Sequence, residues 1–361
     1  QACLAAAYPF VFVGTTNGVV AYAVNDPSNG AVPPIPVTGV PFLPNQITAM
    51  GSRVYFVGAV SGTGPTYRAP IAWIDVPADP LATGLEASTS FASLSVASLN
   101  AAWAGTDGSL FLVDYDATRS FPSGNATAPV KDGAAVSFFP SPAVPSGGVP
   151  VAVSGSRLVV ARWQSQTTPF QTYFSFETGA ATASAQNSGE QATYTQIGPT
   201  SPQGAYAQGP DGSLLWNTGA IVVDDAGATD TATVRLAWLV ASGTTSQFDA
   251  SANVDIEIYG SPVPIGTAVV GPVAWVDGNT ALVLAAADGT LGNGTGGQTS
   301  VQVAVRTPKP ALASGRRYVV AANVQQVGAA SSGGFGYVLA ADAAGATTCT
   351  LHVFAPACAG P

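Results

Sequence analysis

Pairs of short apolar segments, each joined by a tight turn, recur along the whole chain. Residues 9–24 read PFVFVGTTNGVVAYAV, and residues 99–116 read LNAAWAGTDGSLFLVDYD. Asn-Gly and Asp-Gly tolerate the positive φ that two-residue hairpin turns require. The 41 glycines and 28 prolines interrupt helical periodicity throughout. These patterns predict an all-β fold built from hairpins.

The hairpins return at intervals that predict propeller blades. Strand onsets fall near residues 10, 54, 101, 157, 205, 273 and 317. A repeat of roughly 40–50 residues made of several short strands is typical of a β-propeller. We therefore predict a single β-propeller domain over residues 1–361, with seven blades most favoured and six to eight allowed. Its N- and C-terminal segments are expected to close the ring.

The interval between residues 205 and 273 is longer than the others. It contains TATVRLAWLV at 231–240 and ANVDIEIYG at 252–260, which form either the outer strands of a large fifth blade or an eighth blade. A string of tandem β-sandwich domains is the alternative fold, because sandwiches also use short strands with Pro and Gly turns.

Residues 10–42 carry a resemblance to a known family. An apolar strand at 12–13, a second at 20–22, the Asp-Pro-x-x-Gly turn at 26–30 and Val-Pro-Phe at 40–42 follow one another in order. This segment resembles one blade of the lactonase-like, YVTN-type seven-bladed propellers. The resemblance implies the same fold, and the other blades match it in outline.

The family's chemistry does not transfer to identifiable residues. The resemblance implies a central polar cluster, which holds a divalent cation in some members and uses His, Arg and Glu in others. This chain has one histidine, His352, inside the apolar segment LHVF, which predicts a strand residue. No Gly-x-Ser-x-Gly motif occurs, and no paired Cys or His spacing occurs outside the C-terminal tail. We therefore predict no catalytic residue.

Acidic residues offer the one alternative for a metal. Asp114 and Asp116 lie close together, as do Asp224, Asp225 and Asp230. Ca²⁺ prefers such hard oxygen ligands, but the Asp-x-Asp-x-Asp-Gly loop is absent. Aspartates at strand ends also form Asx-turns. We predict no cofactor and no metal site, with Ca²⁺ as the alternative.

Charge is scarce. Charged residues make up 9% of the chain, against roughly a quarter in ordinary domains. The formal net charge is −9, so the cationic face that nucleic acid requires is missing, and nucleic-acid binding is excluded. No segment has the length and apolarity of a transmembrane helix. A surface with little charge repulsion favours contact between copies, which predicts a homo-oligomer or polymer.

The three cysteines, Cys3, Cys349 and Cys358, stand near the two ends. The start Gln1-Ala2-Cys3 fits a mature chain after signal-peptide removal, so we expect a secreted, extracellular or cell-surface protein; a lipid on Cys3 is less favoured. An extended TLHVF between Cys349 and Cys358 spans roughly 17 Å, too far for a disulfide. We predict a Cys3–Cys358 bond, with Cys349 as the alternative partner.

Aromatic residues and sequons suggest glycans. Six tryptophans lie mostly inside apolar strands, which predicts core packing. Trp163 and Trp216 have polar neighbours and are candidates for stacking on sugars. Asn125 and Asn293 begin Asn-x-Thr sequons and are candidate glycosylation sites.

Together these features predict an exported, non-enzymatic β-propeller. We expect it to act as a cell-surface or extracellular structural or binding protein, with roles in adhesion or self-assembly, and with glycans or surface proteins as partners. The alternative is a lactonase-like hydrolase whose central site is metal-dependent or degenerate.

Overall fold

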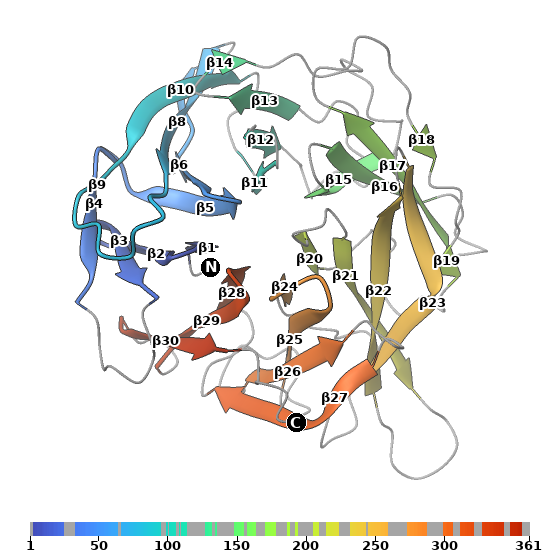
Figure 1. The fold of residues 1–361 in the computed structure, drawn as a ribbon. Helices are drawn as coiled ribbons and strands as arrows, with labels where there is room; N and C mark the ends of the chain where they lie inside the picture. The colour runs from blue at the N-terminus through green and yellow to red at the C-terminus, as the bar shows by residue number, and fades with distance from the viewer. Residues whose placement is uncertain are drawn as a thin grey trace. The chain divides into compact units, whose positions relative to one another are not determined.

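A computed structural model gives the fold (Figure 1). Between residues 113 and 272 it describes strand backbones without side chains. Every element in the described ranges is a β-strand. Those ranges are 3–24, 33–63, 66–94, 99, 101–105, 108, 110–113, the strands from 127 to 258, 273–286, 299–305, 311–320, 327–342 and 347–355.

The chain divides into two compact units. The N-terminal unit comprises Cys3–Ala161 and Phe174–Gln186, and the C-terminal unit comprises Gln1–Ala2, Arg162–Tyr173 and Asn187–Pro361. Within the described residues the strands form seven sheets, which we number in chain order. In sheets 1 to 3 and 5 to 7 the described strand pairs are antiparallel except β4 and β9, which are parallel.

The first three sheets lie in the N-terminal unit. Sheet 1 has the order β1-β2-β3-β4-β9, with strands Leu4–Ala7, Phe10–Thr15, Gly18–Ala23, Ile35–Thr38 and Leu85–Glu86. Sheet 2 has the order β5-β6-β8-β10, with strands Pro44–Met50, Arg53–Gly58, Thr66–Asp75 and Ser88–Leu94, and β7 (Ser61–Thr63) pairs with β8. Sheet 3 runs β11 to β14, with strands Ala101–Ala104, Leu110–Val113, Thr127–Lys131 and Ala134–Ala135.

The remaining sheets also follow chain order. Sheet 4 contains β15 to β19, at Gly148–Ser154, Arg157–Trp163, Phe170–Glu177, Gln186–Asn187 and Ala192–Thr193. Sheet 5 contains β20 to β23, at Ala205–Gln208, Leu214–Val223, Ala232–Ser242 and Thr245–Ile258. Sheet 6 contains β24 to β27, at Val273–Trp275, Thr280–Ala286, Thr299–Val305 and Ala311–Val320. Sheet 7 contains β28 to β30, at Val327–Ser332, Phe335–Ala341 and Cys349–Phe354.

The expected strand near residue 317 begins no sheet, so that part of the blade prediction is wrong. Residues 314–320 belong to β27, the fourth strand of sheet 6, and sheet 7 begins at Val327. The sequence suggests an inner strand here because the run Tyr-Val-Val-Ala-Ala after Arg317 resembles the small apolar first strands of the other hairpins. Its side chains Tyr318 and Val319 are nevertheless 47% and 39% exposed, as an outer strand allows.

The long interval after residue 205 has a simple explanation. Strands β22 and β23, which contain most of the segments at 231–240 and 252–260, are the third and fourth strands of sheet 5. Of the two alternatives left open for these segments, the sheet order agrees with the outer strands of one large sheet. The onsets near 10, 54 and 157 mark second strands (β2, β6 and β16), whereas those near 101, 205 and 273 mark first strands.

Strand β6 is buried on both faces. Val54 and Phe56 face sheet 1, where Phe56 meets Phe12 edge to face with ring centroids 5.9 Å apart. The alternate side chains Tyr55 and Val57 belong to a second cluster, shared with sheet 3. Successive side chains of a strand point to opposite faces, so one apolar strand joins two cores. In the C-terminal unit, sheets 6 and 7 share a similar cluster.

We expect Phe56→Ala to lower the free energy of unfolding by about 3–5 kcal/mol, because the side chain is fully buried and its removal leaves a cavity. Leu81 is 74% exposed, so Leu81→Ala serves as a control and should change stability by less than about 0.5 kcal/mol. Urea titration followed by tryptophan fluorescence measures both. A loss below about 1 kcal/mol for Phe56→Ala would contradict the two-sided packing.

Candidate functional site

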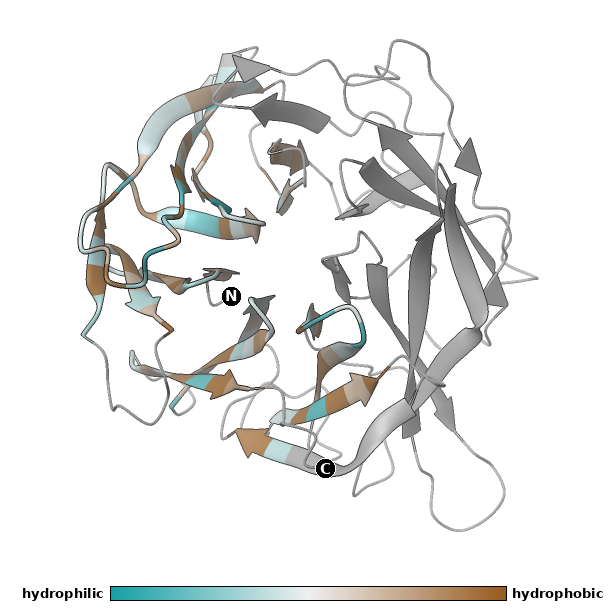
Figure 2. Ribbon diagram, in the orientation of Figure 1, coloured by the Kyte–Doolittle hydropathy of each residue, from teal (hydrophilic) through white to brown (hydrophobic). Residues whose placement is uncertain are grey.

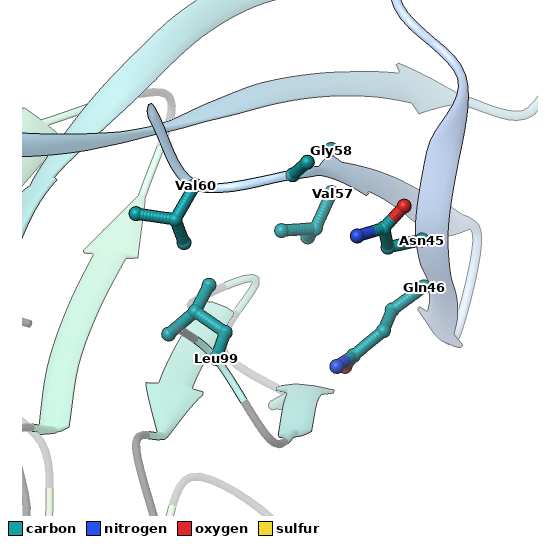
Figure 3. A pocket seen from close by; sticks show the side chains of 7 residues that line it. Asn45, Gln46, Val57, Gly58, Val60 and Leu99 are labelled. Atoms are coloured by element: carbon teal, nitrogen blue, oxygen red, sulfur yellow. The ribbon is translucent and has the colours of Figure 1, made fainter. Parts of the chain in front are cut away.

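A pocket of about 230 Å³ opens beside the start of β5 in the N-terminal unit (Figure 3). Its lining comes from β5, from the end of β6 with the two residues after it, and from the segment before β11. The lining residues are Asn45, Gln46, Val57, Gly58, Ala59, Val60 and Leu99. Figure 2 shows that β5 is hydrophilic near its start, in contrast to the neighbouring hydrophobic strands.

A β-bulge explains why two consecutive polar side chains reach one pocket. Pro44 pairs with Gly58 and Gln46 pairs with Val57, so Asn45 is an extra residue without a partner across the ladder. Successive side chains normally point to opposite faces of a sheet, and a bulge re-aims them. The amides of Asn45 and Gln46 accordingly extend toward the same side (Figure 3). Proline suits this position because it donates no ladder hydrogen bond.

Glycine is required at the pocket wall. A Cβ atom built on Gly58 would lie 2.7 Å from the Phe42 ring and 2.8 Å from the Pro70 ring. Both distances are too short for nonbonded carbon atoms. The missing side chain therefore lets Phe42 and Pro70 pack against the end of β6, beside the pocket.

The lining is polar on one side and apolar on the other, without a charged side chain. Asn45 is exposed and Gln46 half-buried, and each amide provides two N–H donors and an acceptor oxygen. Val57 is buried, whereas Val60 and Leu99 are half-buried. Such a lining suits a neutral group that has both hydroxyl and C–H surfaces. The volume of about 230 Å³ lies below the roughly 300–1,000 Å³ of pockets for drug-sized ligands, so the space suits a group the size of a single ring or side chain.

Cys3 lies behind the β5 wall of the pocket. Its Sγ lies 3.2 Å from the carbonyl oxygen of Asn45 and 3.6 Å from that of Pro44. Burial raises the pKa of the Cys3 thiol, which disfavours the reactive thiolate. Within the described residues Cys3 and Cys349 are not joined to each other by a disulfide, and Cys358 lies outside those residues. The pairing of Cys3 with Cys358 stays a prediction.

His352 lies in a second polar and aromatic group, in the C-terminal unit. It belongs to β30, as the apolar pattern predicts, and its ring stacks at a tilt on Tyr318 of β27 with centroids 5.5 Å apart. Phe354 meets the same tyrosine edge to face at 5.6 Å. Burial lowers the pKa of His352, while the charge of Asp342 opposes this shift. Asp342 accepts a hydrogen bond of 2.6 Å from the Thr350 hydroxyl, which lowers the pKa of its carboxyl group.

The remaining predicted residues fall where side chains are not described. Trp163 ends β16 and Trp216 lies in β21, without described side chains. The sequon residues Asn125 and Asn293 lie outside the described residues, as do the candidate Ca²⁺ ligands Asp114, Asp116, Asp224, Asp225 and Asp230. Tryptophan packing is confirmed for Trp275, which is 1% exposed in β24.

Sequence reasoning missed Asn45 and Gln46. The Pro-Asn-Gln triplet at 44–46 precedes an apolar run and is consistent with a bulge, but neither amide stands in a recognised motif. In the part of the chain that is described, no group of three His, Cys, Asp or Glu side chains is placed to hold a metal ion. No described helix is long and apolar enough to cross a membrane.

Comparison with known proteins shows likeness at the level of solved structures only. No protein-family profile matches the sequence, and no curated protein is similar to it. Among solved structures, a DUF4623 family protein from Bacteroides eggerthii DSM 20697 is similar at 12% identity, with a TM-score of 0.37. The alignment covers 84% of this chain and 68% of that one.

We expect the thiols to differ in reactivity toward iodoacetamide. Cys349 is exposed and should be modified first at pH 7, whereas Cys3 should react roughly tenfold more slowly and accelerate only at higher pH. Peptide mass spectrometry after timed quenching follows each site. If Cys3 and Cys358 are joined, neither reacts until a reductant is added. Equal rates at Cys3 and Cys349 would contradict the burial of Cys3.

Proposed function

We propose that this chain is an exported, non-enzymatic β-propeller that acts as an extracellular structural or binding protein. We further propose that its pocket binds a neutral polyhydroxylated ligand, such as one sugar residue of a glycan. The observation that carries the ligand class is the bulge at Asn45, which turns two neutral amides toward one partly apolar pocket. Amides hydrogen-bond to hydroxyl groups, while Val60 and Leu99 offer contacts to C–H groups.

The propeller fold is supported by how neighbouring sheets pack within each unit. Sheets 1 and 2 share one apolar cluster, and sheets 2 and 3 share the next. In the C-terminal unit, sheets 6 and 7 pack in the same manner. Face-to-face packing of consecutive sheets of about four strands is expected for the blades of a propeller, and it supports this proposal. The resemblance of residues 10–42 to the YVTN-type, lactonase-like family supports the same proposal.

The low charge of the chain supports a role in contacts with neighbours. Only 9% of the residues are charged, so repulsion between copies is weak. The proposed protein therefore works at a surface or in an assembly of its own copies, outside the cell. The alternative is a catalytic role like that of lactonases. If the protein hydrolyses a member of a panel of lactones, this catalytic role replaces the proposal that the protein only binds its ligand.

We expect Asn45→Asp to weaken glycan binding roughly tenfold, because the change replaces two N–H donors with a charge that the ligand does not match. Screening a panel of neutral oligosaccharides identifies a ligand, and isothermal titration calorimetry measures its affinity. Asn17→Asp is the matched control, since the same substitution lies in the exposed turn before Gly18 and Asp-Gly turns are equally favourable. The Asn17→Asp variant should bind the oligosaccharide with the same affinity as the unmodified protein.

Two outcomes would count against the pocket as a glycan site. The first is an oligosaccharide that binds with the same affinity to the Asn45→Asp variant. The second is the failure of every neutral oligosaccharide in the panel to bind. Both results can be interpreted only if the Asn45→Asp variant keeps the native circular dichroism spectrum. Gln46→Ala provides a second variant, which introduces no charge into the pocket.

A further inference from the structure

Strand β30 forms one edge of sheet 7. The sheet has the order β28-β29-β30, and the six residues of β30 pair with β29 without a register shift. In the described part of the chain no strand pairs with the other side of β30. Sheets 5 and 6 of the same unit each have a fourth strand in the corresponding position.

The hydrogen-bonding pattern shows which backbone groups point outward from β30. The N–H of Asp342 donates to the carbonyl oxygen of Thr348 at 3.1 Å, next to the pair of Ala341 and Cys349. In an antiparallel ladder, hydrogen-bonded and non-hydrogen-bonded pairs alternate. Thr350, His352 and Phe354 therefore bond toward β29. Cys349, Leu351 and Val353 direct their N–H and C=O groups to the free edge.

This edge lacks the features that usually block strand pairing. Proteins protect edges with charged residues, prolines or bulges. The sequence of β30, CTLHVF, contains neither proline nor a Lys, Arg, Asp or Glu residue. By contrast, the fourth strands β23 and β27 contain charged residues and have register shifts in their ladders. Val353 is also 41% exposed, and Cys349 is exposed.

We propose that β30 pairs antiparallel with β30 of a second copy of this chain, about a two-fold axis through Leu351. The inference rests on the proposed assembly role and names the surface by which copies join. A second copy is the occupant because the edge complements itself: a low-charge strand meets its own outward-facing groups. Pairing of the two edges joins two three-stranded sheets into one continuous sheet.

The two-fold axis determines the register. An axis perpendicular to the sheet keeps each side chain on its own face, so outward-bonding residues oppose outward-bonding residues. Leu351 then faces Leu351 of the partner subunit, and Val353 faces Cys349 of the partner subunit. This register forms three hydrogen-bonded pairs. With the two-fold axis through His352, only two hydrogen-bonded pairs form: Leu351 with Val353 of the partner subunit, and the symmetric pair.

The first test measures dimer dissociation by sedimentation equilibrium at neutral pH. Val353→Lys places a charge on the proposed edge and should weaken the dimer at least tenfold, as lysine does at natural edges. Val319→Lys is the matched control, because Val319 lies on β27 and its side chain, at 39% exposed, is about as exposed as that of Val353. Its dimer should dissociate like that of the unmodified protein. Circular dichroism confirms that both variants remain folded.

The second test reads the register by cross-linking. In a Cys349→Ser background, Leu351→Cys should form an intermolecular disulfide under mild oxidation, because opposed Cα atoms of a hydrogen-bonded pair lie about 5.5 Å apart. Val319→Cys in the same background should not form an intermolecular disulfide. Mass spectrometry of the linked peptide identifies the bond between residues 351.

The outcomes separate this inference from the assembly proposal. A monomer at all concentrations, without a cross-link at residue 351, overturns both. An assembly that survives Val353→Lys and gives no cross-link at residue 351 leaves the assembly proposal standing and overturns the β30 interface. Loss of the dimer with Val353→Lys alone, together with the residue 351 disulfide, supports the interface.

Discussion

The N-terminal unit depends on one strand that is buried on both faces. Alternate residues of β6 supply Phe56 to the cluster with sheet 1 and Tyr55 to the cluster with sheet 3. Burial of each aromatic side chain contributes about 1.5–3 kcal/mol relative to exposure. Because the two clusters share this strand, the positions of three sheets are coupled. A β-strand makes this coupling possible through its two-residue period.

The same strand ladder also builds the candidate pocket. Strand β5 pairs with β6, and the extra residue Asn45 interrupts that ladder at the point where Pro44 meets Gly58. The bulge leaves Asn45 outside the ladder and turns its side chain to the side of Gln46. The packing of β6 holds one wall of the pocket in place, while the bulge supplies the polar groups. A rigid core therefore positions neutral hydrogen-bonding groups at its edge.

The edge of sheet 7 shows how the low charge of the chain acts locally. Tyr318 contacts both His352 and Phe354, so sheets 6 and 7 touch through aromatic side chains near β30. The Thr350 hydroxyl bonds to Asp342, which anchors the start of the strand to the end of β29. These contacts hold β30 in an extended form at the edge of sheet 7, where no strand of the described residues pairs with its outer side.

The sequence by itself determined the strand class, because Asn-Gly and Asp-Gly turns and two-residue periodicity depend on neighbouring residues only. It also identified His352 as a strand residue, but it left two alternatives open for the segments at 231–240 and 252–260. It misassigned residues near 317, because the Tyr-Val-Val run of an outer strand resembles an inner strand until its neighbours are known. Tertiary structure alone decided the pocket at Asn45 and Gln46 and the place of β30 at the edge of sheet 7, as the described strands define that sheet. Both depend on which strand lies alongside, and a bulge or an unpaired edge is a property of two strands together.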